Sequence, residues 1–317
     1  MLMKQLFTIF LFFGFATHAQ DYALVDAKVK QYPHYRTAQS LATKIIADFT
    51  NDGDKIRATF IWLTHNIKYD LKEYFNPTSK SFSFKYKNEA EKQQKLQHLK
   101  DQVVNEMFTS RKSVCEGYAQ SFKKICDLLN IEAHVIKGYA RNSTGEIGQI
   151  PRSSNHAWNA VKVGLKWQLI DATWAAGYAI NNTWEKHFTE YYFYPKPQEL
   201  VRTHLPNEAS WQLIQNPISS KTYANQPIIG QGFFSKNLQL KSPNKGVLKA
   251  KKITFQILNL KKNHVVGYQF KGQKYGRKAT AIINNNIGSF SIDLKNKRNT
   301  ELYIFIDSEI ALEYKIE

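Results

Sequence analysis

Cysteine is scarce in this chain, with only Cys115 and Cys126 among 317 residues. No CxxC or HxxxH pair occurs, and two cysteines at this spacing cannot share one zinc ion. On a helix, eleven residues at 1.5 Å each separate them by about 16 Å, well beyond the roughly 7 Å that a disulfide allows between Cα atoms. The scarcity therefore excludes a disulfide-rich fold, and we expect neither a metal nor another cofactor.

Long apolar runs are also missing, except at the N-terminus. The run from Leu6 to Phe15 has ten residues, which is too short to span a bilayer as a stable helix. Lys4 precedes it and the small residues of Thr17-His18-Ala19 follow it, as in a secretory signal. We therefore expect cleavage before Gln20, a periplasmic or secreted protein, and no transmembrane segment.

Acidic residues are nearly absent from a long stretch in the C-terminal third, residues 236–298. From Lys236 to Arg298 there are fifteen Lys and Arg and one acid, Asp293, a net charge of +14 (15 − 1) out of +18 for the whole chain. Charge of this density attracts polyanions. In an exported protein this favours an anionic envelope polymer over nucleic acid, for which no motif is present. A solvated lysine-rich surface would give the same count, so both interpretations stay open.

The hydrophobic periodicity changes along the chain. A helical period predicts helices at 37–49, 56–67, 89–111 and 115–129. A period of two then predicts strands at 133–140, 157–163 and 167–172. The aromatic stretch 178–220 has no regular period and is expected to wrap around the fold. Beyond residue 225, six short alternating segments predict a small β-sandwich; they span 253–258, 265–270, 279–283, 289–294, 301–306 and 311–316.

These patterns predict an α+β protein with three parts. The signal peptide is assigned to residues 1–19 and a domain of N-terminal helices and an antiparallel sheet to residues 20–220. An immunoglobulin-like β-sandwich is assigned to residues 221–317, which hold most of the net positive charge.

The two cysteines have different positions on the helix predicted at 115–129. Cys126 lies on the apolar stripe of that helix and is interpreted as a core residue, a common role for free cysteine. Cys115 lies at the helix start, where unpaired backbone N–H groups stabilise a thiolate. A cysteine at a helix start is more often structural than catalytic, and a nucleophile also needs a base with an orienting partner.

A predicted hairpin supplies both partners. Glycine as the first residue of the Gly164-Leu165 loop suits a type II′ turn, which places Val163 opposite Lys166. In that register His156 and Asp171 project from the same face as diagonal neighbours, within reach of each other. A slip of one residue would put them on opposite faces of the sheet.

Three segments resemble one known family. VCEGYAQSF, NHAWNAV and WQLIDATW are similar to the motif segments of the transglutaminase-like (papain-like) superfamily. Flanking segments resemble the branch that includes the kyphoscoliosis peptidase and fungal cytokinesis regulators. The resemblance covers about residues 37 to 220 and implies a papain-type core. It implies Cys115 as nucleophile, His156 as general base and acid, and Asp171 as the orienting acid; Ala172 stands where proline is common.

The resemblance also implies an activity. A Cys115 thiolate would attack an amide or ester carbonyl, and the Cys115 backbone N–H would help to hold the oxyanion. Tyr69, Trp62 and Asn155 are candidates for the second donor, and we favour Tyr69. The expected function is an exported acyl-transfer enzyme that hydrolyses or transamidates protein or peptide amides. The alternative is a non-catalytic, envelope-associated scaffold on the same fold.

Overall fold

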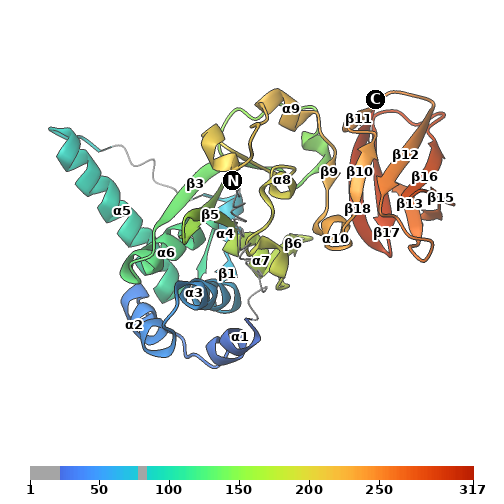
Figure 1. Ribbon diagram of the computed structural model, residues 1–317. Helices are drawn as coiled ribbons and strands as arrows, with labels where there is room; N and C mark the ends of the chain where they lie inside the picture. Colours follow the sequence, from blue (N-terminus) through green and yellow to red (C-terminus); the bar gives the residue numbers. More distant parts are fainter. Residues whose placement is uncertain (1–21, 78–83) are drawn as a thin grey trace, which may run out of the picture.

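The computed structural model describes residues 22–77 and 84–317, so the predicted signal segment lies outside the described residues. Buried apolar side chains form two clusters, one between Val25 and Leu200 and the other between Ile229 and Ile316. Figure 1 shows the corresponding lobes side by side. We call the part from α1 to α9 the N-terminal lobe and the part from β9 to β18 the C-terminal lobe.

Helices dominate the first half of the N-terminal lobe, and polar side chains cap several of them. The caps Thr37, Asn51 and Asn88 each accept a hydrogen bond from a backbone N–H of the first turn. The four helices predicted from the sequence are confirmed as α2, α3, α5 and α6. The helices of this lobe are α1 Ala23–Val29, α2 Ala38–Asp48, α3 Asp52–Asn66, α4 Leu71–Phe75, α5 Glu89–Ser110, α6 Cys115–Leu128, α7 Ala172–Ala176, α8 Pro197–Leu200 and α9 Ser220–Ala224.

An antiparallel sheet packs against α6 in strand order β5-β4-β3-β8. Its strands are β3 Ala133–Ala140, β4 His156–Val163, β5 Lys166–Ile170 and β8 His204–Pro206. The predicted register is confirmed, because Val163 pairs with Lys166 and the ladder continues to Asn159 and Ile170. Gly164 has φ 57° in the turn, a left-handed conformation that glycine adopts without strain.

The stretch 178–220 contains more regular structure than predicted. It includes most of a hairpin of β6 Gly177–Ile180 and β7 Thr183–Lys186, and it includes the edge strand β8. Strands of three or four residues are too short to show a reliable period of two, which explains why the pattern missed them. A Cβ atom on Gly138 would lie 2.3 Å from the Leu205 carbonyl oxygen, so glycine allows β8 to pack closely against β3.

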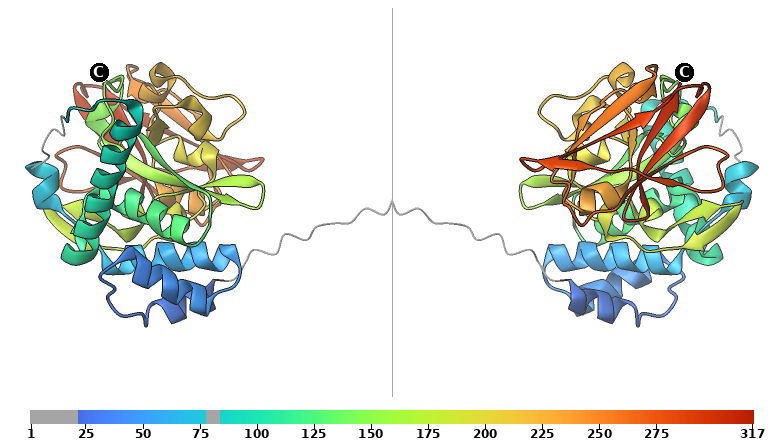
Figure 2. Two further views of the ribbon diagram at one scale, coloured as in Figure 1. Left: turned by 90° about the vertical axis from the view of Figure 1, so that its left-hand side faces the viewer. Right: turned by 90° about the vertical axis from the view of Figure 1, so that its right-hand side faces the viewer.

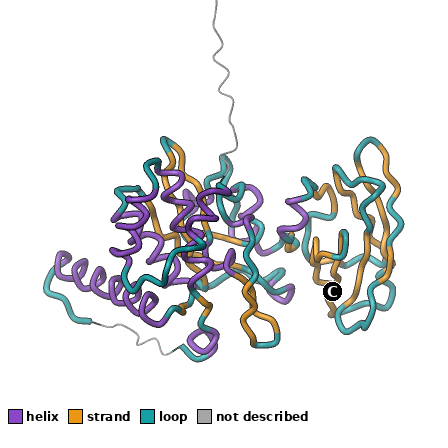
Figure 3. The backbone as a smooth tube through the Cα atoms, turned by 90° about the horizontal axis from the view of Figure 1, so that it is seen from below, coloured by secondary structure: helices purple, strands orange, loops and turns teal. Residues whose placement is uncertain are grey.

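The C-terminal lobe consists mainly of two packed sheets, as predicted (Figure 3). One has the order β10-β12-β16-β15 and the other β11-β18-β17-β13-β14, with β9 also paired to β18. The segment predicted at 279–283 is shifted, because β15 begins at Ile282. The elements are β9 Ile228–Ile229, α10 Gln231–Ser235, β10 Gln239–Ser242, β11 Val247–Leu248, β12 Lys252–Leu258, β13 Val266–Phe270, β14 Arg277–Lys278, β15 Ile282–Asn284, β16 Ile287–Asp293, β17 Thr300–Ile306 and β18 Glu309–Ile316.

Buried polar contacts join the two lobes. The Arg141 guanidinium donates to the carbonyl oxygens of Tyr223, Ala224 and Pro227 along the connecting segment. The Thr144 hydroxyl donates to Glu313 of β18 across the junction. The two side views in Figure 2 show the N-terminal helices and the C-terminal strands on opposite sides of the molecule. Within residues 22–77 and 84–317, no helix combines the length and apolarity that crossing a membrane requires.

Candidate active site

Cys115 is the first residue of α6, as predicted, and its side chain is half-buried. The N-cap residue, Val114, makes no side-chain cap hydrogen bond, so the first backbone N–H groups are open to another acceptor. A Cβ atom on Gly117 would lie 1.9 Å from the Ser113 Oγ atom. Glycine at this position therefore lets strand β2, Lys112–Ser113, lie against the first turn of the helix.

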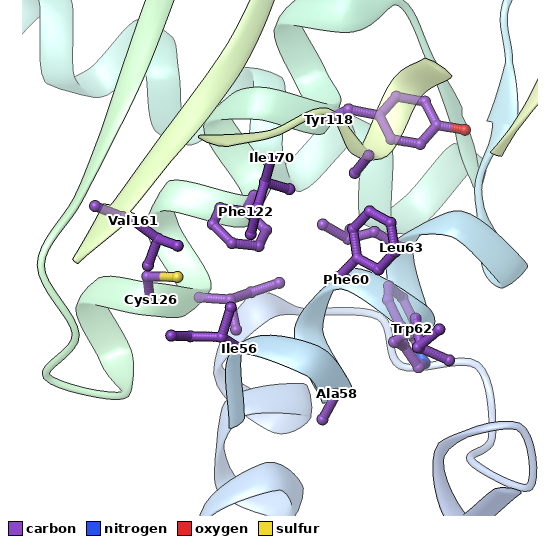
Figure 4. Close-up of a cluster of buried hydrophobic side chains, with 14 of the residues drawn as sticks. Ile56, Ala58, Phe60, Trp62, Leu63, Tyr118, Phe122, Cys126, Val161 and Ile170 are labelled. Carbon is purple, nitrogen blue, oxygen red and sulfur yellow. The ribbon is translucent and has the colours of Figure 1, made fainter. Parts of the chain in front are cut away.

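Cys126, in the last turn of the same helix, is fully buried. Figure 4 shows its sulfur among the side chains of Phe122, Val161 and Ile56. Burial raises the pKa of the Cys126 thiol well above its usual range, because a thiolate there would lose its hydration. Both cysteines are free, and the prediction that Cys126 is a core residue is confirmed.

His156 and Asp171 meet as the register predicts. His156 Nε2 lies 2.6 Å from Asp171 Oδ2, and both side chains are buried. Strand β5 ends at Ile170 instead of the predicted Ala172, because Asp171 is the N-cap of α7. In that role its Oδ1 atom accepts a hydrogen bond of 2.9 Å from the Trp174 N–H. Both carboxylate oxygens are therefore held in place.

The electrostatics of the pair favour a charged imidazole. Burial alone would lower the pKa of His156, but the charge and hydrogen bond of Asp171, followed by the Cys115 sulfur, raise it to about 10. Burial would likewise raise the pKa of Asp171, yet His156 and then His204 hold it below its usual range. The imidazolium and the carboxylate stabilise each other in a place where either alone would be costly.

The structure adds a residue that the sequence interpretation missed, His204 at the start of β8. Its Nε2 atom lies 3.1 Å from Asp171 Oδ2, the same oxygen that His156 contacts. Its ring packs against Trp158, Trp174 and Tyr192. Burial lowers the pKa of His204 despite the opposing effect of Asp171. The short strand that carries it gave no periodic signal, so only its polar type within an aromatic stretch could have singled it out.

One group of the described residues has the composition of a metal site. Ligand atoms of His156, Asp171 and His204 all lie within 4.8 Å of one another. The two contacts to Asp171, at 2.6 and 3.1 Å, have the lengths of hydrogen bonds. Hydrogen bonding thus accounts for the arrangement without an ion.

A cavity of about 560 Å³ opens beside His156. Tyr69 lines it from β1, Lys68–Tyr69, which pairs with β2 and so lies near Cys115. Burial, followed by the Cys115 sulfur, raises the pKa of Tyr69, which keeps its hydroxyl protonated and able to donate. Cys115 itself is not among the lining residues, but it neighbours both Tyr69 and His156.

The other two candidate oxyanion donors are engaged elsewhere. Trp62 is buried, and its indole N–H faces the Pro33 carbonyl oxygen at 3.3 Å. Asn155 lines the cavity, but its side-chain amide bonds to both the N–H and the carbonyl of Ala140. Of the three candidates, only Tyr69 combines a cavity position with proximity to Cys115.

Comparisons with known proteins point to one superfamily. Residues 39–172 match the model of the Transglutaminase-like superfamily. The kyphoscoliosis peptidase of Mus musculus is 25% identical over 229 residues, covering 71% of this chain and 32% of that protein. Cytokinesis protein 3 of Schizosaccharomyces pombe is 26% identical over 151 residues, covering 45% of this chain and 17% of that protein. This chain thus spans about a third or less of the length of these curated relatives.

A solved structure with partial similarity is the periplasmic domain of TgpA from Pseudomonas aeruginosa. It has a TM-score of 0.25 and 15% identity, and the match covers 49% of each chain. The match to the family model agrees with the helices and the antiparallel sheet described above. Residues 39–172 are therefore similar to the Transglutaminase-like superfamily.

Proposed function

We propose that this protein is an acyl-transfer enzyme in which Cys115, His156 and Asp171 form a catalytic triad. The observation that carries the proposal is the buried His156–Asp171 pair beside a cysteine at an uncapped helix start. Its substrates would be amides of proteins or peptides, in keeping with the superfamily.

The triad would work as a preformed ion pair. With its pKa at about 10, His156 would be protonated at neutral pH, and this charge together with the helix start would favour a thiolate on Cys115. The thiolate attacks the substrate carbonyl carbon, and the carbonyl π electrons move to oxygen. When the tetrahedral intermediate collapses, His156 gives its proton to the leaving amine and a thioester forms. Neutral His156 then removes a proton from water or an amine, which attacks the thioester and releases Cys115.

Two donors would stabilise the oxyanion. The Cys115 backbone N–H lies at a helix start without a side-chain cap, and the helix dipole favours negative charge there. The Tyr69 hydroxyl is the proposed second donor, supported by its place in the cavity and its proximity to Cys115.

The experiment that tests this function uses an activated ester, p-nitrophenyl acetate. We expect a burst of p-nitrophenol and an acetyl group on Cys115, detected by mass spectrometry, in the wild type and in Cys126→Ala. Adding glycine ethyl ester then separates hydrolysis from transfer to an amine. Absence of the burst and of the adduct in a folded wild type would reject the enzyme and favour the scaffold.

We also propose a division into two domains, with the boundary after α9, Ser220–Ala224, a few residues beyond the expected 220/221, and with export directed by residues 1–19. Two separate hydrophobic clusters support the division, with the segment bonded to Arg141 as the connection. Cleavage before Gln20 would appear as a new N-terminus in the protein purified from its native host, and an intact Met1 in exported material would contradict it.

The basic stretch would attach the protein to an anionic envelope polymer. Of its fifteen cations, only Lys236, Lys249 and Lys271 have a carboxylate within 4 Å in the described part of the chain. Retention on isolated envelope should fall steeply with salt, since the Debye length shrinks to about 3 Å at 1 M. Replacing the unpaired Lys261, Lys262 and Lys274 by Gln should weaken retention. Unchanged retention in high salt would leave the lysines as a solvated surface.

A further inference from the structure

The walls of the cavity beside His156 indicate which substrates it accepts. No Lys, Arg, Asp or Glu is among the described residues that line it, although the chain as a whole is rich in charge. Aromatic rings line it from β1, α4, α7, β6, β7 and the 3-10 turn Glu190–Tyr192, and they are Tyr69, Tyr74, Phe75, Trp174, Tyr178, Trp184 and Tyr192. A neutral aromatic wall binds apolar groups and disfavours charged ones, which would lose hydration without gaining a partner.

Several of the rings that line the cavity are exposed to solvent. Tyr74 and Phe75 of α4 are 49% and 52% exposed, and Tyr178 of β6 is 52% exposed. Tyr74 packs against Tyr69, which stacks on Trp184 with ring centroids 5.5 Å apart. Exposed aromatic rings gathered around a cleft mark a binding site, since covering them is favourable.

We propose that α4 and the β6–β7 hairpin form a subsite for a neutral apolar or aromatic side chain next to the amide that is attacked. This inference rests on the proposed function and names its substrate class. Acidic and basic side chains would lose hydration there without gaining a partner, because no Lys, Arg, Asp or Glu is among the described lining residues and the charge of His156 is already paired with Asp171.

Chloroacetyl-dipeptide amides that differ at one position, Phe or Glu, test the subsite. Their rates of alkylation at Cys115, divided by their rates with free glutathione, should favour Phe by at least about tenfold, the effect of covering one aromatic ring. Tyr74→Ala combined with Phe75→Ala should reduce that preference. Tyr275→Ala is the matched control, because Tyr275 is an exposed ring of the other lobe.

The outcomes separate this inference from the proposed function. Equal rates for both probes, or an unchanged preference in the double variant, would overturn the subsite while iodoacetamide still alkylates Cys115. If iodoacetamide fails to alkylate Cys115 at neutral pH, the proposed function and the subsite fall together.

A second inference rests on a different observation, the two histidines on one carboxylate oxygen. Asp171 Oδ2 lies 2.6 Å from His156 Nε2 and 3.1 Å from His204 Nε2. An ionised carboxylate accepts hydrogen bonds but donates none, so His204 must carry its proton on Nε2 to bond there. Its Nδ1 atom lies 2.9 Å from the Thr203 hydroxyl, whose one proton can go to Nδ1 or to the Leu200 carbonyl oxygen 3.3 Å away. Burial, which lowers the pKa of His204, favours the neutral ring, in which Thr203 donates to Nδ1.

We infer that His204 is a positioning residue for the triad. It touches neither Cys115 nor the cavity in the described contacts, and its ring lies edge-on to that of His156 with centroids 5.4 Å apart, so its hydrogen bond reaches the triad through Asp171. Its hydrogen bond holds Oδ2 in line with His156 and stabilises the carboxylate, which in turn keeps His156 protonated. The aromatic rings of Trp158, Trp174 and Tyr192 fix its own orientation.

Two substitutions of His204 distinguish a positioning role of its hydrogen bond from a packing role of its ring. His204→Phe keeps an aromatic ring but removes the donor, whereas His204→Gln can present an amide N–H near the position of Nε2. We expect alkylation of Cys115 by iodoacetamide at pH 6 to fall about tenfold in the Phe variant, as for loss of one hydrogen bond to a charged group. The Gln variant should recover most of that loss. A Phe variant with the wild-type pH profile would overturn the inference.

Nitrogen NMR of the wild type tests the same point without a variant. At pH 7, His204 should be neutral with its proton on Nε2, and His156 should carry both protons. His204 with its proton on Nδ1 alone would overturn the inference, because a bare Nε2 atom cannot donate to Asp171.

Discussion

The first and last turns of helix α6 carry the same side chain in opposite surroundings. Cys115 lies at an uncapped N-terminus beside His156 and Tyr69. Cys126 lies among apolar side chains, and burial raises the pKa of its thiol. The comparison shows that the neighbours of a thiol determine its chemistry, since both cysteines belong to one rigid element.

Removing each thiol should give the sharpest contrast. Cys115→Ala should abolish the acetyl adduct and the burst with p-nitrophenyl acetate, because the nucleophile is gone, and should leave the thermal midpoint nearly unchanged. Cys126→Ala should keep both signals. Equal loss of activity in two folded variants would remove the distinction between the two ends of the helix.

Asp171→Asn should lower activity by at least roughly a hundredfold, since an amide cannot stabilise the imidazolium or hold the His156 tautomer. The variant loses charge but keeps its shape, so circular dichroism should show a folded protein. Steady-state rates with the ester provide the measurement. A variant with near wild-type rates would mean that His156 acts without its acid.

Stability should depend on pH through His156. Its pKa is about 10 in the folded protein and about 6.5 when unfolded, so its contribution is complete below pH 6.5 and is lost as the pH rises toward 10. In urea unfolding between pH 7.5 and 8.5, Cys115→Ala, which removes the thiol whose own titration would offset that of His156, should lose up to about 1.4 kcal/mol per pH unit more than Cys115→Ala combined with His156→Gln. Parallel curves for the two proteins would show that the folded imidazole is not charged.

The smallest effect concerns the buried end of the helix. Cys126→Ala should lower the free energy of unfolding by about 1 kcal/mol or more, because it leaves a small void among apolar side chains. Chemical unfolding with Cys115→Ala as the reference gives the difference. If Cys115→Ala destabilises the protein as much, the first turn is part of the core and not an open site.

Much of this fold could be predicted from the sequence because its long helices and strands have a clear hydrophobic period. The apolar stripe that includes Phe122 and Cys126 predicted α6, and Gly164-Leu165 predicted the register that brings His156 to Asp171. These features are local, so a single sequence reveals them.

The missed features depend on contacts between distant segments. His204 reaches Asp171 from a strand of three residues, too short for a detectable period. Tyr178 and Phe75 line the same cavity from elements about a hundred residues apart, and no pattern in either segment indicates the other. The sequence indicated three candidate oxyanion donors and favoured Tyr69, and the tertiary structure adds that Trp62 and Asn155 make other hydrogen bonds.

The pH dependence of Cys115 alkylation tests the central claim most directly. The wild type and Asp171→Asn are treated with iodoacetamide from pH 5 to pH 9, and the Cys115 peptide is quantified by mass spectrometry. The account predicts a wild-type rate that is already near its maximum at neutral pH, because His156 is charged, and a reduced neutral-pH rate in Asp171→Asn. A wild-type rate that rises only around pH 8.5, as for an ordinary thiol, and matches the variant would contradict the account.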